Sequence, residues 1–397
     1  MPPSDFDAGE RLVDLVDHLH QVGALTDPRW RDAFLQVPRH LFVPDPVWAE
    51  DGSRDDGWMI PVGRDDPYWW ENVYADFALP TQVDDGAPAG EDGRGRYTTS
   101  SISQPSLVAR MLEALTPVDG ARVLEIGTAT GYNCALLCAR LGAENVVTVE
   151  VDPVLAERGR AALHAAGWKP TVVCGDGTQG VPAEAPFDRV LATVAAKRVP
   201  HAWVRQTRPG GSIITPWGND YMATALLRLE VGEDGVATGR PIGDAPFMWL
   251  RDQRAHGGRW SDFVDFDAKV RTSRTRVDPH AVVEAGGGAE FAVGTSVPGL
   301  CRAWFDAEDD SGEATLWLYD TKGAWASVDY VPEVGEYEVE QAGPRDLWEE
   351  VEAAVVWWER AGRPERERFG LTVSRDGQHV WLDRPENGVA RPFAVAP

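Results

Sequence analysis

The sequence lacks long hydrophobic runs, and its few cysteines are widely spaced. No stretch of about 18 apolar residues occurs, so no transmembrane helix is predicted. The first ten residues are acidic and polar, so no signal peptide is expected. The 4 cysteines form no CxxC pair, and neither they nor the histidines have a spacing typical of metal ligands. A reducing, cytoplasmic setting, with no membrane partner and no metal, is therefore predicted.

Positive charge is also scarce. The chain has 38 Lys and Arg residues against 63 Asp and Glu residues, for a formal net charge of −25. Nucleic acids bind clustered cations that neutralise phosphates, so this balance argues against DNA or RNA as a partner. A basic peptide is a compatible partner. An acidic surface that serves solubility alone explains the same composition.

The length of 397 residues suits two or three domains. Three regions are expected: residues 1–100 with N-terminal helices and an insert loop, 101–245 as a cofactor-binding domain, and 246–397 as an α+β module for peptide recognition. In the first region, apolar residues from Leu12 to Leu19 recur at helical spacing. Residues 46–97 are polar and aromatic, and their Gly-, Asp- and Pro-rich end, 84–96, is expected to be mobile.

Predicted strands and helices alternate in the middle region. Strands are expected at 122–126, 146–150, 171–174, 187–192 and 212–216, and helices at 105–115, 132–141, 154–166 and 200–207. Such alternation is typical of a parallel-rich sheet between helices, so the predicted fold class is α/β and Rossmann-like. The C-terminal region differs, because two hairpins, with turns at 321–323 and 375–378, flank a helix over 344–362.

The segment Val123–Tyr132, with the sequence VLEIGTATGY, combines a buried strand, a glycine-rich turn and a helix start. Glycine permits positive φ and close approach of a ligand. Glu150 ends the next strand, and Asp176, in Gly175–Gly177, ends the third. With Glu125, inside the first segment, three acids thus lie at the ends of consecutive strands. Each acid alone would be an ordinary loop residue. Because carboxyl ends of parallel strands meet at one edge, the three together predict a cofactor site, with Glu150 on a ribose and Asp176 near an adenine amino group.

The charges in this segment favour one cofactor. Glu125 directly precedes the turn, where its carboxylate would repel a dinucleotide pyrophosphate. S-adenosylmethionine has no phosphate; Glu125 can neutralise its ammonium, and the helix start at 130–133 can accept its carboxylate. A methyltransferase that uses S-adenosylmethionine is therefore predicted. Ala129 interrupts the glycines, so the turn is expected to hold Ala129 at a φ allowed for an L-residue.

A family resemblance rests on further segments. These are Val37–Pro44 (VPRHLFVP), Tyr74–Asp76, Ser101–Pro105 (SISQP), Gly127–Tyr132, Glu150, Gly175–Gly177 and Arg208–Gly211 (RPGG). Their order resembles that of protein-L-isoaspartate O-methyltransferases over about residues 10–220. The resemblance implies a class I methyltransferase domain with S-adenosylmethionine as cofactor.

The pattern and the resemblance together assign the site. The expected cofactor-binding residues are Glu125, Gly127, Thr128, Thr130, Gly131, Asn133, Glu150, Val151, Asp176, Gly177 and Thr193. The resemblance implies that Ser103 is catalytic and lies at the mouth of the site, near the methyl donor and the accepting carboxylate. Ser103 is also placed to be the N-cap, or part of the preceding turn, of the helix that Pro105 opens, and this structural role is compatible with the catalytic one. Residues expected near the substrate are Tyr74, Asp76, Ser101 and Gln104.

The usual ending of this family is not recognisable after Gly218. The chain resembles a subset that acts on ribosomally synthesised modified peptides (RiPPs) made with ATP-grasp macrocyclases (graspetides) or lanthionine synthetases, and Arg366–Asp383 adds to this resemblance. It implies that a modified, macrocyclic precursor peptide is the partner and that an aspartate is esterified and then closes to aspartimide. The alternatives are an isoaspartate repair enzyme and a non-catalytic scaffold that binds a precursor. The sequence does not indicate the oligomeric state.

Overall fold

The computed structural model describes residues 5–52, 57–254, 260–284 and 286–389. These residues fall into two compact units. The first comprises residues up to Val194, Pro200–Thr215 and Glu230–Gly235, and the second comprises Ala195–Val199, Pro216–Leu229 and residues from Val236 onward. None of the helices in the described ranges is long and apolar enough to cross a membrane.

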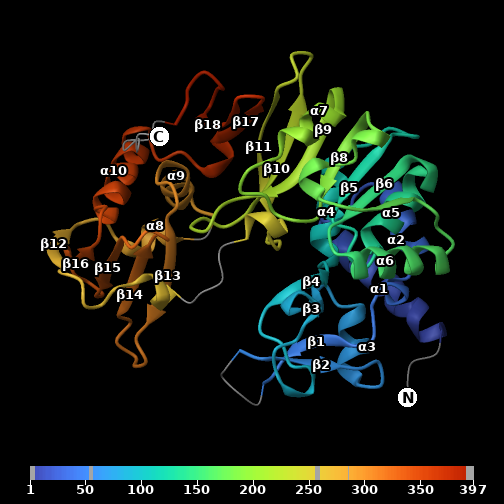
Figure 1. The fold of residues 1–397 in the computed structure, drawn as a ribbon, viewed down its shortest axis with the longest axis horizontal. Coiled ribbons are helices and arrows are strands. Elements are labelled where there is room, and N and C mark those ends of the chain that lie inside the picture. Colours follow the sequence, from blue (N-terminus) through green and yellow to red (C-terminus); the bar gives the residue numbers. More distant parts are fainter. Residues whose placement is uncertain (1–4, 53–56, 255–259, 285, 390–397) are drawn as a thin grey trace. The chain divides into compact units, whose positions relative to one another are not determined.

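The first unit begins with helices and short strands and continues as an α/β sheet (Figure 1). Its N-terminal elements are α1 (Asp5–Gln21), α2 (Pro28–Gln36), β1 (Val47–Glu50), β2 (Met59–Val62), α3 (Pro67–Val73), β3 (Leu79–Val83) and β4 (Thr98–Ile102). Next come α4 (Pro105–Leu115), β5 (Val123–Ile126), α5 (Tyr132–Leu141), β6 (Val146–Glu150), α6 (Pro153–Ala165), β7 (Thr171–Cys174), β8 (Phe187–Ala192), α7 (His201–Gln206) and β9 (Thr207–Trp217). Short 3-10 turns in this unit are η1 (Arg39–Leu41), η2 (Asp84–Gly86), η3 (Glu91–Gly93), η4 (Ala143–Asn145), η5 (Gly177–Gln179) and η6 (Pro182–Glu184).

The sheet of the first unit is parallel, with strand order β7-β6-β5-β8-β9. In the central strand β5, Val123 pairs with Val146 of β6 and with Arg189 of β8. Every residue of β5 and β6 is buried, as expected where helices cover both faces of a parallel sheet. The predicted α/β architecture is confirmed. Strand β9 is longer than predicted, because its pairing with β8 starts already at Thr207.

The described parts of residues 46–97, a segment expected as a loop, contain regular structure. β1 and β2 pair as an antiparallel hairpin, and β3 pairs with β4. The carboxylate of Asp84 accepts hydrogen bonds from the backbone amides of Arg96 and Tyr97, which closes the segment between β3 and β4. The sequence did not indicate these strands because each is four or five residues long and pairs across an intervening turn or helix.

The second unit is α+β. Its elements are β10 (Ala225–Val231), β11 (Ala237–Asp244), β12 (Arg271–Thr275), α8 (Pro279–Val283), α9 (Gly288–Ser296), β13 (Cys301–Asp306), β14 (Ala314–Tyr319), β15 (Trp325–Tyr330), β16 (Tyr337–Ala342), α10 (Leu347–Arg360), β17 (Phe369–Ser374) and β18 (Gly377–Leu382). Its 3-10 turns are η7 (Arg251–Gln253), η8 (Trp260–Phe263) and η9 (Arg366–Arg368). One sheet is antiparallel with the order β12-β16-β15-β14-β13, and β11 pairs with β17, which pairs with β18. Both predicted hairpins, β14–β15 and β17–β18, are present.

Two glutamines of the second unit hold the segment that follows β8 in the chain. Gln253 accepts from the amides of Lys197 and Arg198 and donates to the carbonyl of Arg198. Gln378, in the β17–β18 hairpin, accepts from the amide of Val199 and donates to the carbonyl of Lys197. Five backbone groups of this segment are therefore satisfied by two side chains that are distant in the sequence.

Candidate active site

The glycine-rich turn joins β5 to α5 in a crowded setting. Gly127 has φ 98° and Gly131 has φ 86°. A Cβ atom at Gly127 would lie 2.7 Å from Oγ1 of Thr193, and one at Gly131 would lie 3.0 Å from Cγ of Leu163. Both glycines are therefore required by backbone conformation and by close packing within the protein itself. Ala129 has φ 44°. The turn therefore places an L-residue in the small left-handed region, which is allowed but rarely adopted and strained for alanine.

Glu125 is completely buried beneath this turn. Its carboxylate accepts hydrogen bonds from Oγ1 of Thr148, at 2.6 Å, and from Nδ2 of Asn133, at 2.6 Å. Thr128, also buried, shares a hydrogen bond of 2.7 Å with the hydroxyl of Thr148. Three of the predicted cofactor residues therefore meet in one network, and Thr148 is a member that the sequence reading missed. Contact between Glu125 and a ligand would require water or a movement of this carboxylate.

Burial raises the pKa of Glu125 to about 7, against the opposing effect of the hydrogen bonds from Thr148, Asn133 and Cys134. The usual pKa is 4.5, so between these values the folded protein binds more protons than the unfolded chain. The raised pKa of Glu125 therefore adds to the free energy of unfolding. The addition is complete below the usual pKa of 4.5 and is lost as the pH rises through the folded-state pKa of about 7. Its size is on the order of 3 kcal/mol.

The variant Glu125→Gln, which resembles the protonated side chain, should lack this pH dependence. We expect the free energy of unfolding of the variant, minus that of the ligand-free wild type, to grow as the pH rises from about 5 to about 8. Denaturant unfolding of both proteins across this range measures the difference. A difference that stays constant with pH would show that Glu125 is ionised throughout.

Glu150 connects the end of β6 to the glycine turn. Its Oε2 accepts from the amide of Ala129 at 2.9 Å, and its Oε1 accepts from the amide of Asp152 at 3.1 Å. Asp152 caps α6 and accepts from Nε2 of Gln82 in β3. The next residue after Glu150, Val151, is 43% exposed. Glu150 therefore lies at the predicted edge, and Gln82 brings the β3–β4 hairpin to the same strand end.

The ends of β7 and β8 reach this edge as well. Glu150 pairs with Cys174, the last residue of β7, and Ile126 pairs with Ala192, the last residue of β8. Asp176 is exposed and accepts hydrogen bonds from the amide and hydroxyl of Thr178, at 2.8 and 2.7 Å. Beyond β8, the hydroxyl of Thr193 donates to the carbonyl of Gly127 at 2.8 Å. Four strand ends thus present predicted residues at one edge of the sheet. A further one, Gly177, is buried, and its carbonyl accepts from Nε1 of Trp203.

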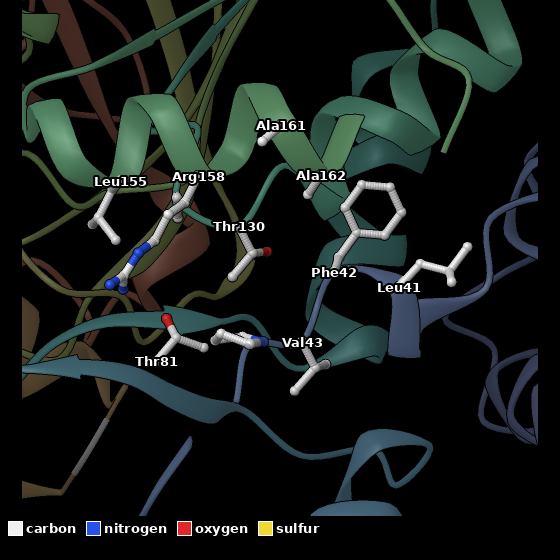
Figure 2. Close-up of a pocket in the computed structure, with 11 residues that line it drawn as sticks. Leu41, Phe42, Val43, Thr81, Thr130, Leu155, Arg158, Ala161 and Ala162 are labelled. Carbon is white, nitrogen blue, oxygen red and sulfur yellow. The ribbon is translucent and has the colours of Figure 1, made fainter. Parts of the chain in front are cut away.

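A mostly apolar cavity of about 250 Å³ lies outside the glycine turn, against α6 (Figure 2). Its lining residues are Leu41, Phe42, Val43, Pro44, Thr81, Ala129, Thr130, Leu155, Arg158, Ala161 and Ala162. Thr130, one of the predicted cofactor residues, lines this cavity and lies between α6 and Phe42 in Figure 2. The motif around Phe42 therefore packs next to the turn, although the sequence separates them by some 90 residues.

Ser103 lies in the turn between β4 and α4. The residue that caps α4 is Gln104, which makes no side-chain capping bond, so Ser103 is not the N-cap and instead lies in the turn that precedes the helix, the other structural role expected for it. The carboxylate of Asp76 instead accepts from the amide of Ser106 at 2.8 Å and from Nε2 of Gln104 at 3.3 Å. The structure therefore brings Asp76 and Gln104, two of the predicted substrate residues, together next to the turn that contains Ser103.

The other two predicted substrate residues lie close by in the sequence but face different partners. Tyr74 is buried, its hydroxyl lies 2.6 Å from Nδ1 of His40, and burial raises its pKa to about 12. Ser101 is half-buried in β4, opposite Pro80 of β3. The sequence reading missed His40 as a partner of Tyr74, although both belong to segments on which the family resemblance rests.

Comparison with known proteins agrees with this geometry. The family described as Protein-L-isoaspartate(D-aspartate) O-methyltransferase (PCMT) matches residues 65–254. A protein-L-isoaspartate O-methyltransferase of Methanopyrus kandleri is 35% identical over 246 residues, which cover 61% of this chain and 91% of that protein. One of Thermococcus onnurineus is 34% identical over 246 residues, which cover 62% of this chain and 94% of that protein.

The solved structure of a protein-L-isoaspartate O-methyltransferase has the same fold, with a TM-score of 0.53 and 22% identity over 94% of this chain and 100% of its own. Fold and site together define a class I methyltransferase dependent on S-adenosylmethionine. The chain belongs to the protein-L-isoaspartate O-methyltransferase family. Its enzyme class is that of the carboxyl O-methyltransferases.

Proposed function

We propose that this protein transfers a methyl group from S-adenosylmethionine to the carboxylate of L-isoaspartyl residues in peptides or proteins, as a repair methyltransferase. The observation that carries the proposal is the fixed turn at Ser103, held by Asp76 at the amide of Ser106, in a chain of this family. Ser103 touches the accepting carboxylate in this proposal, and its hydroxyl has no other hydrogen bond among the described contacts.

The residues at the strand ends suit the cofactor. Glu150 and Asp176 offer carboxylate oxygens to the ribose hydroxyls and the adenine amino group, and Val151 is exposed beside them. The start of α5 carries no side-chain cap at Gly131, and the amide of Tyr132 makes only a 3.4 Å hydrogen bond to Oγ1 of Thr130, so this helix start can offer donors to the carboxylate of the methionine moiety. When bound, S-adenosylmethionine supplies a methyl group on a sulfonium.

The transfer needs no general base. A peptide carboxylate has a reference pKa of about 4 and is ionised at neutral pH, so it can attack the methyl carbon directly. The protein therefore has to orient the carboxylate and exclude water, because the negative acceptor and the positive sulfonium lose charge together. A partly buried serine and a fixed turn suit this task better than a base would.

Esterification of an aspartate in a macrocyclic precursor, followed by aspartimide formation, would use the same chemistry. It was expected mainly because the chain continues past the recognisable family segments. A solved isoaspartate methyltransferase, however, matches the fold over 94% of this chain, so the C-terminal module does not by itself indicate a dedicated peptide. Repair is therefore the better-supported proposal, and peptide recognition by the module stays a separate proposal.

One labelling experiment discriminates these substrates. Radiolabelled S-adenosylmethionine is offered with matched isoaspartyl and aspartyl peptides, each linear and macrocyclic, and the products are analysed by mass spectrometry. We expect methylation of the linear isoaspartyl peptide and little of its aspartyl twin. Labelling confined to normal aspartate in a ring, with later loss of methanol, would instead establish aspartimide formation. Absence of labelling on all four peptides would contradict both substrates.

A further inference from the structure

Arg39, in the first 3-10 turn of the chain, is fully buried and surrounded by backbone carbonyls. Its Nη1 donates to carbonyls at and just after the end of α3, namely those of Val73 at 2.6 Å, Asn72 at 3.3 Å and Ala75 at 3.5 Å. Its Nη2 donates to Phe77 at 2.9 Å, Ser103 at 3.0 Å and Ile102 at 3.3 Å. One guanidinium therefore joins residues 72–77 to residues 102–103.

Stability alone does not account for this arrangement. The hydrogen-bond partners of Arg39 are all neutral oxygens, and desolvation lowers its pKa to about 10, while the nearby Tyr132 and the carboxylate of Asp76 oppose that shift. A buried charge is costly to desolvate, and apolar residues of similar volume often stabilise a protein as well or better. What an apolar residue cannot do is fix two irregular segments by hydrogen bonds in several directions.

The two segments that Arg39 joins are those that carry the candidate acceptor site. Residues 72–77 include Asp76, which accepts from the amide of Ser106, and residues 102–103 end in Ser103 itself. The Ser103 turn is thus held at its carbonyl by Arg39 and at a following amide by Asp76. Without the guanidinium, six carbonyls would each lose a hydrogen-bond donor, and the bonds to Val73 and Ile102 are buried, so both segments would be freer to shift.

We propose that Arg39 is a positioning residue for methyl transfer, which holds the Ser103 turn and the 72–77 segment in the geometry that the acceptor carboxylate requires. The inference rests on the proposed function. Arg39 itself touches neither the cofactor nor the acceptor in this proposal and acts through Ser103 and Asp76. Its loss should therefore reduce kcat more than it changes cofactor affinity.

Two substitutions test this role. Arg39→Met keeps much of the volume without hydrogen bonds, and Arg39→Lys keeps the charge without the planar fork. With the linear isoaspartyl peptide, we expect kcat of Arg39→Met to fall on the order of 10- to 100-fold. Arg39→Lys should fall less. The affinity for S-adenosylhomocysteine, measured by calorimetry, should stay within a few-fold of wild type for both variants.

Arg140→Met is the matched control. Arg140 is also largely buried, but it pairs with Asp119 at 2.8 Å and lies over Trp30, away from the Ser103 turn. This variant should keep wild-type turnover even if it loses stability. Unchanged turnover in Arg39→Met would overturn the proposal, as would a parallel loss of cofactor affinity and turnover, because that result indicates general structural damage.

Hydrogen exchange separates this proposal from the proposed function. Amides of residues 72–77 and 102–106 should exchange faster in Arg39→Met than in wild type, while those of α5 and β6 should not change. If wild type methylates none of the peptides, the proposed function fails, and exchange still reports on Arg39. Unchanged exchange at these segments would then overturn the positioning role.

Discussion

Gly127→Val is expected to abolish cofactor binding. At φ 98° an L-residue is strained, and a Cβ would lie 2.7 Å from Oγ1 of Thr193 and 3.3 Å from Cγ1 of Val194. A branched side chain adds two methyl groups to this contact, so the turn or the end of β8 has to move. The hydrogen bond from Thr193 to the carbonyl of Gly127 is then lost. We expect affinity for S-adenosylhomocysteine to fall at least about 100-fold, or about 2.7 kcal/mol, by calorimetry.

A matched substitution separates the steric effect of a side chain at Gly127 from the effect of backbone strain. Gly120 also has positive φ, at 73°, but an added Cβ there would meet no atom within 4 Å. Gly120→Val should therefore lose some stability while it keeps its cofactor affinity. Circular dichroism and thermal melting of both variants establish that they fold. Tight cofactor binding by folded Gly127→Val would place the cofactor elsewhere in the protein.

Ser103→Ala should depress methyl transfer and leave cofactor affinity within a few-fold of wild type. The Ser103 hydroxyl has no hydrogen bond among the described contacts, so its removal leaves no protein group unpaired and little stability is at risk. If the hydroxyl orients the acceptor carboxylate, its loss should reduce kcat on the order of 100-fold. Steady-state kinetics with the linear isoaspartyl peptide measure this change.

The control for Ser103→Ala is Ser212→Ala in β9, which removes another unpaired hydroxyl, in this case a buried one. Turnover of this variant should match wild type. If Ser103→Ala also keeps wild-type turnover, the serine has no part in the reaction, and the acceptor carboxylate is oriented by other groups.

The parallel sheet was predictable because its central strands β5 and β6 are buried on both faces and its strands appear as short apolar runs between helices. α5, β6 and β8 begin and end where the pattern placed them. The β1–β4 region was not predictable in this way, since its strands are short and partly polar and depend on distant contacts. The carboxylate of Asp84, which closes the segment before β4, resembles any other acid in a Gly- and Asp-rich stretch.

The same distinction holds for the residues of the candidate site: those placed by sheet topology were predictable, and those placed by packing were not. Glu150 and Asp176 were predictable because topology alone puts the ends of parallel strands at one edge. The environment of Glu125 was not, since its burial and its bond to Thr148 depend on packing between neighbouring strands. Arg39 was harder still, because its partners are backbone carbonyls, which every residue carries. Ala129 has a left-handed φ although it is not glycine, so the sequence did not indicate that this position of the turn is strained.

The two glutamines at Lys197–Val199 have a consequence for protein engineering. A version shortened to the residues that match the family, 65–254, would retain Gln253 but delete Gln378, and the amide of Val199 and the carbonyl of Lys197 would lose their partners. The same cut would remove β17 and expose the edge of β11. The residues after 254 therefore cannot be removed without loss of these contacts. A chimaera that exchanges them would have to supply an equivalent glutamine and a replacement edge strand.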